Sequence, residues 1–175
     1  MIKNLTSVKN LAIAVACSSL FVTGTAFAGV VAGVGYAQLD ADGPTLGVIV
    51  GSIGYQYEVG SSNFSLTPQL RVGFGMQDDS ITESGVRVKI DVDKAYGVDL
   101  RGQWDFDNTY FFVAPSYINY EIEGKAAGIT VSEDSWEFGA GIGAGLNLSD
   151  NASVELSYEH IDEADAFVIG FRYKF

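Results

Sequence analysis

The stretch YGVDLRGQWDF, residues 96–106, decides the fold of this chain. Its even-numbered positions are Tyr, Val, Leu, Gly, Trp and Phe, whereas its odd-numbered positions are Gly, Asp, Arg, Gln and Asp. Successive side chains of a β-strand point to opposite faces, so this period of two predicts a strand with one apolar face. The alternation recurs at residues 64–76, 136–148, 152–160 and 167–175, and no window shows a convincing helical stripe. The chain is therefore expected to be all-β.

Turn-forming residues divide the chain after residue 29 into eight expected strands. These span residues 30–39, 45–59, 64–77, 86–106, 110–122, 131–148, 152–161 and 166–175. Three connections are short and polar, as expected of hairpin turns, at 60–63, 107–109 and 149–151. The other four are longer on average and rich in acids, near 40–44, 78–85, 123–130 and 162–165. An even number of strands, with short turns at one end and longer loops at the other, is typical of an outer-membrane barrel.

A soluble β-sandwich would also show a period of two, so the composition of the two faces must separate these architectures. The outward face of a sandwich should be thoroughly polar, but here the polar face is rich in glycine and carries charges of both signs. We expect a crowded lumen in which these charges pair, formed by Glu58, Arg71, Asp99, Arg101, Glu137, Glu155, Glu159 and Arg172.

The apolar face has aromatic residues near both ends of the strands, as expected of two interfacial girdles. Those toward the short turns are Tyr57, Phe64, Trp104, Phe106, Tyr110, Phe112, Tyr173 and Phe175, and those toward the long loops are Tyr36, Trp136 and Tyr158. We therefore predict an eight-stranded antiparallel up-and-down transmembrane β-barrel rather than a sandwich.

Composition excludes several classes of function. The 175 residues combine a mean hydropathy of +0.18 with a formal charge of −12, and disorder would require low hydrophobicity. The acidic balance opposes binding to nucleic acid, which is therefore not an expected partner. A single cysteine can form neither an intramolecular disulfide nor a four-cysteine metal site. We expect no cofactor.

Residues 1–28 have the pattern of a secretory signal peptide. A basic start precedes an apolar run at residues 11–22, and Ala26 and Ala28 form a small-x-small cleavage pattern. The apolar run is shorter than the ~20 residues that a helix needs to cross the hydrocarbon core. Cleavage is therefore expected before the barrel domain, which would span residues 29–175.

That cleavage would remove the single cysteine, Cys17, and leave a chain that is still more acidic. An uncleaved anchor is one alternative, because no charged residue occurs between Lys9 and Asp40. Lipidation at Cys17 is a second alternative, although the preceding residues lack the leucine usual in a lipoprotein signal.

The chain ends in VIGFRYKF, with Gly170 followed by Tyr173 and Phe175 at the third-last and last positions. This ending resembles the insertion signal that the barrel-assembly machinery reads. The segments GYAQLDADG at 35–43 and GIGAGLN at 141–147 are similar to the small OmpX/Ail-type outer-membrane proteins. The resemblance implies a monomer in a Gram-negative outer membrane, in contact with lipid and lipopolysaccharide, with a role in adhesion or envelope protection.

The connection at 162–165 predicts one register. If it is a four-residue loop, Ile161 faces Ala166, and Glu155 then lies beside Arg172 on the inner face. A salt bridge between Glu155 and Arg172 is expected, because a lone charge in a dry lumen would cost several kcal/mol.

The short turn at 149–151 predicts a second register, in which Glu155 and Glu159 lie opposite Gly145 and Gly141. These glycines would make room for the acids. A phosphate-binding loop is not expected from them, because such a loop requires a strand followed by a helix. The interior of an eight-stranded barrel is just wide enough for side chains, so a plugged lumen with little conductance is expected.

The expected strand at 86–106 is longer than a membrane crossing requires. It suggests strands that project above the outer leaflet, where an exposed sheet edge could recruit an extracellular protein by strand addition. The alternative is that the extension merely clears the sugar layer. Acidic loop residues could also bridge divalent cations to lipopolysaccharide phosphates, although solvated loop acids are the commoner explanation.

Two further functions remain as alternatives, a small low-conductance pore and a lipid A-modifying enzyme. His160 is expected on the outer wall near the outer interface, where the deacylase family places a histidine with a serine two residues later. Position 162 is Asp162, so the nucleophile that this chemistry requires is missing. We therefore expect a structural or surface-interaction protein and not an enzyme.

Overall fold

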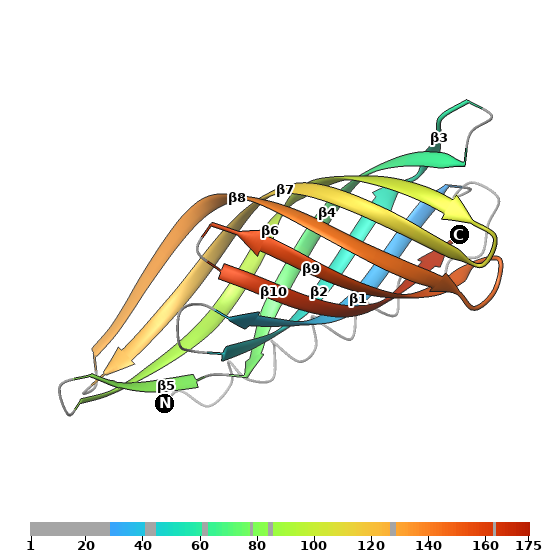
Figure 1. Cartoon of the computed structure of the whole chain (residues 1–175). Helices are drawn as coiled ribbons and strands as arrows, with labels where there is room; N and C mark the ends of the chain where they lie inside the picture. The colour runs from blue at the N-terminus through green and yellow to red at the C-terminus, as the bar shows by residue number, and fades with distance from the viewer. Residues whose placement is uncertain are drawn as a thin grey trace, which may run out of the picture.

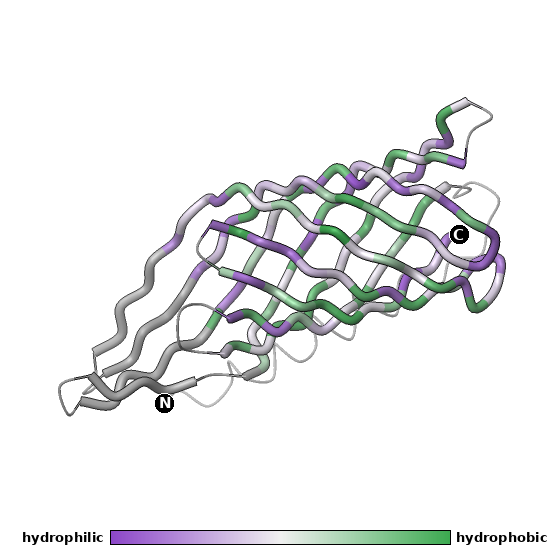
Figure 2. The backbone as a smooth tube through the Cα atoms, viewed as in Figure 1, coloured by the Kyte–Doolittle hydropathy of each residue, from purple (hydrophilic) through white to green (hydrophobic). Residues whose placement is uncertain are grey.

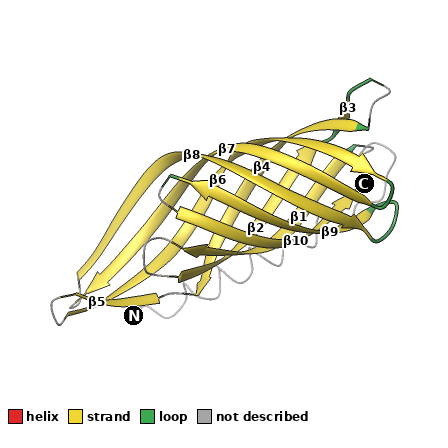
Figure 3. Ribbon diagram, viewed as in Figure 1, coloured by secondary structure: helices red, strands yellow, loops and turns green. Residues whose placement is uncertain are grey.

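The computed structural model describes residues 29–40, 45–60, 63–77, 79–83, 86–126, 129–162 and 164–175. The expected signal peptide, with its cleavage residues Ala26 and Ala28, lies outside the described residues. Within those ranges every regular element is a strand (Figure 3). No helix in this part of the chain is long and apolar enough to cross a membrane.

The strands follow the expected boundaries closely. They are β1 (Val30–Asp40), β2 (Thr45–Tyr55), β3 (Tyr57–Glu58), β4 (Phe64–Gln77), β5 (Asp79–Glu83), β6 (Val86–Phe106), β7 (Thr109–Ala126), β8 (Ile129–Asn147), β9 (Ala152–Ile161) and β10 (Ala164–Lys174). Two are short continuations, since β3 extends β2 beyond Gln56 and β5 extends β4 beyond residue 78. The expected strand at 45–59 is therefore interrupted, and β5 was not anticipated.

Eight strands close into a ring in the order β1, β2, β4, β6, β7, β8, β9 and β10 (Figure 1). Every neighbouring pair is antiparallel, and β10 returns to pair with β1. The backbone N–H of Phe175 donates to the carbonyl of Val30 at 2.9 Å, which continues this seam to the last residue. The predicted eight-stranded antiparallel barrel is confirmed.

Two tight turns differ from expectation. β9 ends at Ile161 and β10 begins at Ala164, which pair directly, so the connection has two residues rather than four. Asp162 reaches this tight turn with a φ of 51°, in the left-handed region that aspartate tolerates. The β6–β7 turn is equally tight, because Phe106 pairs with Thr109 and Asp107 has a φ of 46°.

The two faces of the wall alternate as the sequence predicts, and hydropathy alternates along the strands in Figure 2. Outward side chains such as Phe138 and Ile169 are 78% and 63% exposed, so the protein surface itself is apolar. Tyr110 and Phe112 were placed wrongly, because both are buried in the lumen while Phe111 points outward. Both faces of this part of β7 are apolar, so alternation alone could not orient it.

The lumen has a different filling at each end. Toward the long loops, an apolar cluster fills it, formed by Ala37, Leu39, Leu46, Val48, Val92 and Ala166. Tyr120 packs against this cluster and against a second one formed by Ala95, Ile118 and Ile161. Toward the short turns, charged and polar side chains line the lumen instead. The sequence predicted the polar half and missed the apolar plug.

Three adjacent strands extend well beyond the others. β6, β7 and β8 have 21, 18 and 19 residues, whereas β9 and β10 have 10 and 11. β8 pairs with β9 only from Gly139 to Asn147, so Ile129–Phe138 continue past the end of β9. β5 adds a fourth strand by pairing with β6 (Figure 1). We call the extension formed by β5 and the ends of β6, β7 and β8 the projecting sheet.

Candidate functional site

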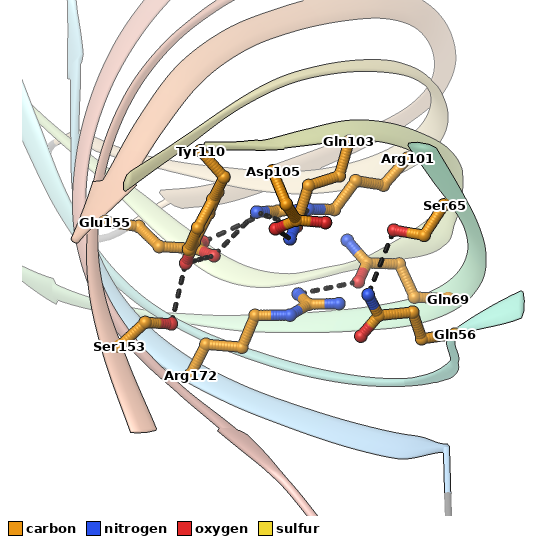
Figure 4. Close-up of polar contacts among 10 residues, drawn as sticks. All are labelled: Gln56, Ser65, Gln69, Arg101, Gln103, Asp105, Tyr110, Ser153, Glu155 and Arg172. Atoms are coloured by element: carbon orange, nitrogen blue, oxygen red, sulfur yellow. Dashed lines mark hydrogen bonds and ion pairs between the residues drawn. The ribbon is translucent and has the colours of Figure 1, made fainter. Parts of the chain in front are cut away.

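The centre of the polar lumen is an ion pair between Arg101 on β6 and Glu155 on β9 (Figure 4). It is bidentate, with Nη2 2.7 Å from Oε1 and Nη1 3.1 Å from Oε2. The hydroxyl of Tyr110, on β7, lies 2.7 Å from the same Oε1 and 2.6 Å from the hydroxyl of Ser153. Three strands are therefore tied together across the interior, because β6, β7 and β9 cannot move apart without breaking this cluster.

Arg101 is satisfied on its remaining sides as well. Its Nε and Nη2 donate to Gln103 Oε1 at 3.1 and 3.0 Å, and Gln103 donates in turn to Asp105 at 2.8 Å. The guanidinium carbon lies 3.5 Å from the centroid of the Phe112 ring, a cation–π geometry. A charge that is only 2% exposed is tolerable because paired and hydrogen-bonded groups surround it.

A second ion pair lies nearer the apolar plug. Arg71 Nη2 on β4 donates to both carboxylate oxygens of Glu159 at 3.0 and 2.9 Å. Arg71 Nε also lies 3.7 Å from Asp99 Oδ2. Asp99 is 5% exposed, and neither of its carboxylate oxygens has a hydrogen-bond partner among the described residues. Arg71 therefore serves two acids, one directly and one at longer range.

Arg172 does not occupy the predicted position. It lies opposite Ser153 rather than Glu155, because the two-residue turn at Asp162 shifts the β9–β10 register by two residues. Its Nη1 donates to Gln69 Oε1 at 3.1 Å, while the carboxylate of Glu155 is held by Arg101. The expected salt bridge between Glu155 and Arg172 is thus replaced by an Arg101–Glu155 pair.

Two further members of the expected charge network lie outside it. Glu58 is on β3 at the short-turn rim, where its largely exposed side chain is 3.5 Å from Lys174 Nζ. Glu137 lies on the part of β8 that extends past β9, and it accepts a hydrogen bond from Ser135. Alternation predicts which face of the wall a residue lies on, but it does not predict the height of the residue along the barrel axis. Glu58 and Glu137 lie at different heights from the other six residues of the expected network.

The glycines of β8 make room for large lumenal side chains. The predicted register is confirmed, since Gly145 lies opposite Glu155 and Gly141 opposite Glu159. A Cβ at Gly141 would stand 2.9 Å from Cγ of Glu159, as expected. A Cβ at Gly145 would instead meet Tyr110 at 2.0 Å, which the sequence reading did not foresee.

The sequence analysis missed Tyr110 and Phe112 as lumenal residues, whereas Gln69, Gln103 and Ser153 lie on the predicted polar face but were not included in the expected charge network. The glycines of β8 could have indicated that Tyr110 and Phe112 face the lumen. Tyr110 and Phe112 lie directly opposite Gly145 and Gly143 on the neighbouring strand, so rings fill the space that these glycines leave. A row of inward glycines predicts a row of large inward side chains beside it.

The cavities of the interior diminish toward the long-loop end. A cavity of about 680 Å³ is lined at the short-turn end by residues such as Asn63, Asp107 and Asn151, and it reaches Arg172. A second cavity, bordered by Arg172, Arg71 and Glu159, is about 70 Å³, and a third is about 30 Å³. A water molecule takes about 30 Å³ in the liquid, so these two hold very few waters.

The residues of the expected assembly signal lie at the seam of the barrel. Gly170 pairs with Gly35 on β1 and with Glu155 on β9. Tyr173 and Phe175 pack edge to face, with ring centroids 5.0 Å apart. Recognition of this ending by the barrel-assembly machinery remains a proposal, carried by the sequence of the ending.

The rim at the long-loop end holds His160, the single histidine of the chain. Its Nδ1 lies 2.7 Å from Asp165 Oδ1, which also accepts a hydrogen bond of 2.6 Å from the Tyr158 hydroxyl. These hydrogen bonds, first from Tyr158 and then from His160, hold the pKa of Asp165 below its usual range. Among the described residues, no group of three or more His, Cys, Asp or Glu side chains is arranged to hold a metal ion.

A closed antiparallel barrel with an apolar outer wall and a filled polar lumen defines an integral outer-membrane protein. Residues 11–175 match the family model described as the outer membrane protein beta-barrel domain. The chain belongs to this family. Its location is therefore the Gram-negative outer membrane, with the short turns in the periplasm and the projecting sheet outside the cell.

Solved structures show the same fold at low sequence identity. Ail, the attachment invasion locus protein of Yersinia pestis, aligns with a TM-score of 0.56 and 16% identity over 83% of this chain and 96% of Ail. Neisserial surface protein A gives 0.52 and 12%, over 83% and 96% of the two chains. The N-terminal barrel of Pseudomonas aeruginosa OprF gives 0.52 and 13%, over 83% and 97%. A search of curated proteins found no match.

Proposed function

We propose that this protein is a sealed scaffold that presents the projecting sheet to extracellular proteins. The observation that carries the proposal is the edge of β8, where Ile129–Phe138 pair with β7 on one side and with no described strand on the other, because they extend past β9. Ten residues of strand span roughly 33 Å. Backbone groups along such an edge can pair with an extended segment of another protein.

The acidic charge of the chain limits which kinds of partner can bind the projecting sheet. Asp134 and Glu137 lie on this edge of β8, and the whole chain carries a formal charge of −12. The Ail structure contains sucrose octasulfate, a heparin analogue. A polysulfated ligand would be repelled by this acidic chain, so we propose a protein segment with basic residues as the partner here.

The experiment compares cells that display the full chain with cells that display a variant lacking residues 122–133, which removes the outer part of the β8 edge. This deletion removes matched positions of β7 and β8, because Ile122 pairs with Glu133. Binding of extracellular matrix proteins should fall at least tenfold, and binding to the full chain should weaken as salt is raised. A matched control is Lys174→Ala, which changes charge at the periplasmic rim. A boiling-dependent gel shift in all three proteins shows that the barrel is intact.

Unchanged binding after the deletion would contradict the adhesive role and leave clearance of the sugar layer as the explanation of the projecting sheet. The pore alternative is opposed by the apolar cluster around Leu39, Leu46 and Val48, which fills the extracellular half of the lumen. An enzymatic role is not part of the proposal, because His160 is oriented by Asp165 with Asp162, not a nucleophile, two residues later.

A further inference from the structure

The periplasmic end of the lumen opens into the cavity of about 680 Å³, which we call the vestibule. Pockets that bind small molecules usually enclose about 300–1,000 Å³. The vestibule narrows at its inner end, where the neighbouring cavity is about 70 Å³, and the apolar plug lies toward the long loops. A small molecule from the periplasm can therefore enter and bind, but it cannot pass through the barrel.

The inner end of the vestibule is lined by Arg172, whose side chain also borders the smaller cavity. Arg172 is 8% exposed, and within the described ranges it forms no ion pair, because Arg101 holds the carboxylate of Glu155. Its Nη1 donates to the neutral amide of Gln69 at 3.1 Å (Figure 4). A guanidinium has five N–H donors, so most of them remain available to a ligand. A carboxylate matches such a fork of donors.

The polar walls beside Arg172 are held in place by hydrogen bonds. Gln56 donates to the Ser65 hydroxyl at 2.9 Å, and Gln103 donates to Asp105 at 2.8 Å (Figure 4). All four of these residues line the vestibule. Because their side chains are already ordered, a ligand that contacts them loses little free energy to further ordering.

The outer opening of the vestibule is acidic. Asp107 lies in the β6–β7 turn and Asp150 in the β8–β9 turn, and both are exposed lining residues. Lys174 also lines the opening, but its Nζ lies 3.5 Å from Glu58, which compensates its charge. The opening therefore repels a simple anion and attracts an ammonium group. The inner guanidinium favours the opposite charge.

The spacing of these charges sets the length of a matching ligand. Arg172 lies opposite Ser153 on β9, and Asp150 precedes Ser153 by three residues. A strand rises ~3.3 Å per residue, so roughly 10 Å of the wall separates the position of the inner cation from the acidic turn. An extended peptide spans at most ~3.3–3.6 Å per residue, so two or three residues cover this distance.

We propose that the vestibule binds free dipeptides and tripeptides in their zwitterionic form. The terminal carboxylate accepts hydrogen bonds from Arg172, and the terminal ammonium group lies against Asp107 and Asp150. The peptide amides between the two termini lie beside Gln56 and Gln103. A longer chain would bring only one of its termini into the vestibule. This periplasmic site is separate from the adhesive function, which belongs to the opposite end of the barrel.

The test is a calorimetric titration of the protein, purified from outer membranes and held in lipid nanodiscs, with trialanine. Two matched peptides each lack one charge, since trialanine amide has no carboxylate and N-acetyl-trialanine has no ammonium group. The amide should bind at least tenfold more weakly, because it loses hydrogen bonds between charged groups at a buried position. The acetylated peptide should bind about threefold more weakly, because the acids that it loses are exposed to solvent.

Variants locate the binding. Arg172→Gln should weaken trialanine binding at least tenfold and remove the difference between trialanine and its amide. Asp107→Asn combined with Asp150→Asn should remove the difference between trialanine and its acetylated form. Asparagine tolerates the left-handed backbone of Asp107, so this second variant keeps the test decisive if Arg172→Gln does not fold. Lys94→Gln removes a positive charge at the opposite end and is the matched control, with unchanged binding expected.

The boiling-dependent gel shift shows that each variant is a closed barrel. Equal affinities for trialanine and its amide, or undiminished binding to folded Arg172→Gln, would overturn the proposal. Equal affinities for trialanine and its acetylated form would overturn it too, and would leave a site for carboxylates in general. No binding of trialanine at millimolar concentration would reduce the vestibule to a solvated opening. Deletion of residues 122–133 tests adhesion at the other end, so the failure of either idea is distinguishable from the failure of the other.

Discussion

The ring of Tyr110 lies against Gly145 of the neighbouring strand so closely that a Cβ at Gly145 would stand 2.0 Å from Tyr110 Cζ. The glycine therefore fixes where the tyrosine hydroxyl points, toward Glu155 and Ser153. In the same way Gly143 admits Phe112, whose ring lies over Arg101. Two glycines on β8 thus determine the positions of Tyr110 and Phe112 on the neighbouring strand, and through them the geometry of the central ion pair.

Replacing Gly145 by alanine is expected to destabilise the folded barrel by about 1–3 kcal/mol, because the added methyl group must displace the Tyr110 ring. The measurement is the urea unfolding midpoint in detergent or lipid vesicles, followed by tryptophan fluorescence. Gly51→Ala is the matched control, since the nearest atom to its added Cβ is 3.6 Å away. Equal midpoints for the two variants would show that Tyr110 is not held in this way.

Removing one partner of the central ion pair should cost about 3–5 kcal/mol, because the other charge stays buried without compensation. Arg101→Met and Glu155→Gln are each expected to lower the unfolding midpoint strongly, and the double variant should lose much less than their combined effect. The exposed pair of Lys174 and Glu58 is the control, where truncation should cost at most about 1 kcal/mol. Strict additivity at Arg101 and Glu155 would contradict a direct pair.

A comparison of Arg172 with Arg101 tests the observed register, because the sequence predicts Arg172 as the partner of Glu155 and the structure has Arg101 in that place. Arg172 contacts the neutral amide of Gln69, whereas Arg101 has a bidentate carboxylate. Arg172→Met should therefore lower the unfolding midpoint clearly less than Arg101→Met. The reverse order would restore Arg172 as the partner of Glu155 and would contradict the observed register.

The alternation of apolar and polar residues determines how much of the structure could be predicted from the sequence. It orients a strand wherever one face is polar, as at residues 96–106 and 152–160, and the predicted faces of those strands agree with the structure. It is silent at Tyr110–Val113, where both faces are apolar. Alternation does not determine the register between strands, which depends on the turns. The tight turn at Asp162 was not recognised in the sequence, so the predicted partner of Arg172 was wrong by two residues. The cross-barrel partners depend on register and closure together.

The pH dependence of the extracellular rim follows from Asp165. Hydrogen bonds from Tyr158 and His160 hold its pKa below the usual value of about 3.9, so the ionised carboxylate is favoured in the folded protein. The resulting stabilisation is fully present above that usual pKa and is lost as the pH falls through the lower folded-state value. A carboxyl ¹³C NMR titration should give a depressed midpoint that rises in Tyr158→Phe. An ordinary midpoint in both proteins would refute the contact.

A sealed scaffold requires an interior that is a structural core, so that the proposed adhesive function resides on the outside of the barrel. Single-channel recording in a planar bilayer tests this requirement most directly. The wild-type protein should give no stable conductance steps, since the plug around Leu39, Leu46 and Val48 closes the extracellular half of the lumen. Steady, reproducible openings from correctly folded wild-type protein would contradict the account and identify the chain as a small pore.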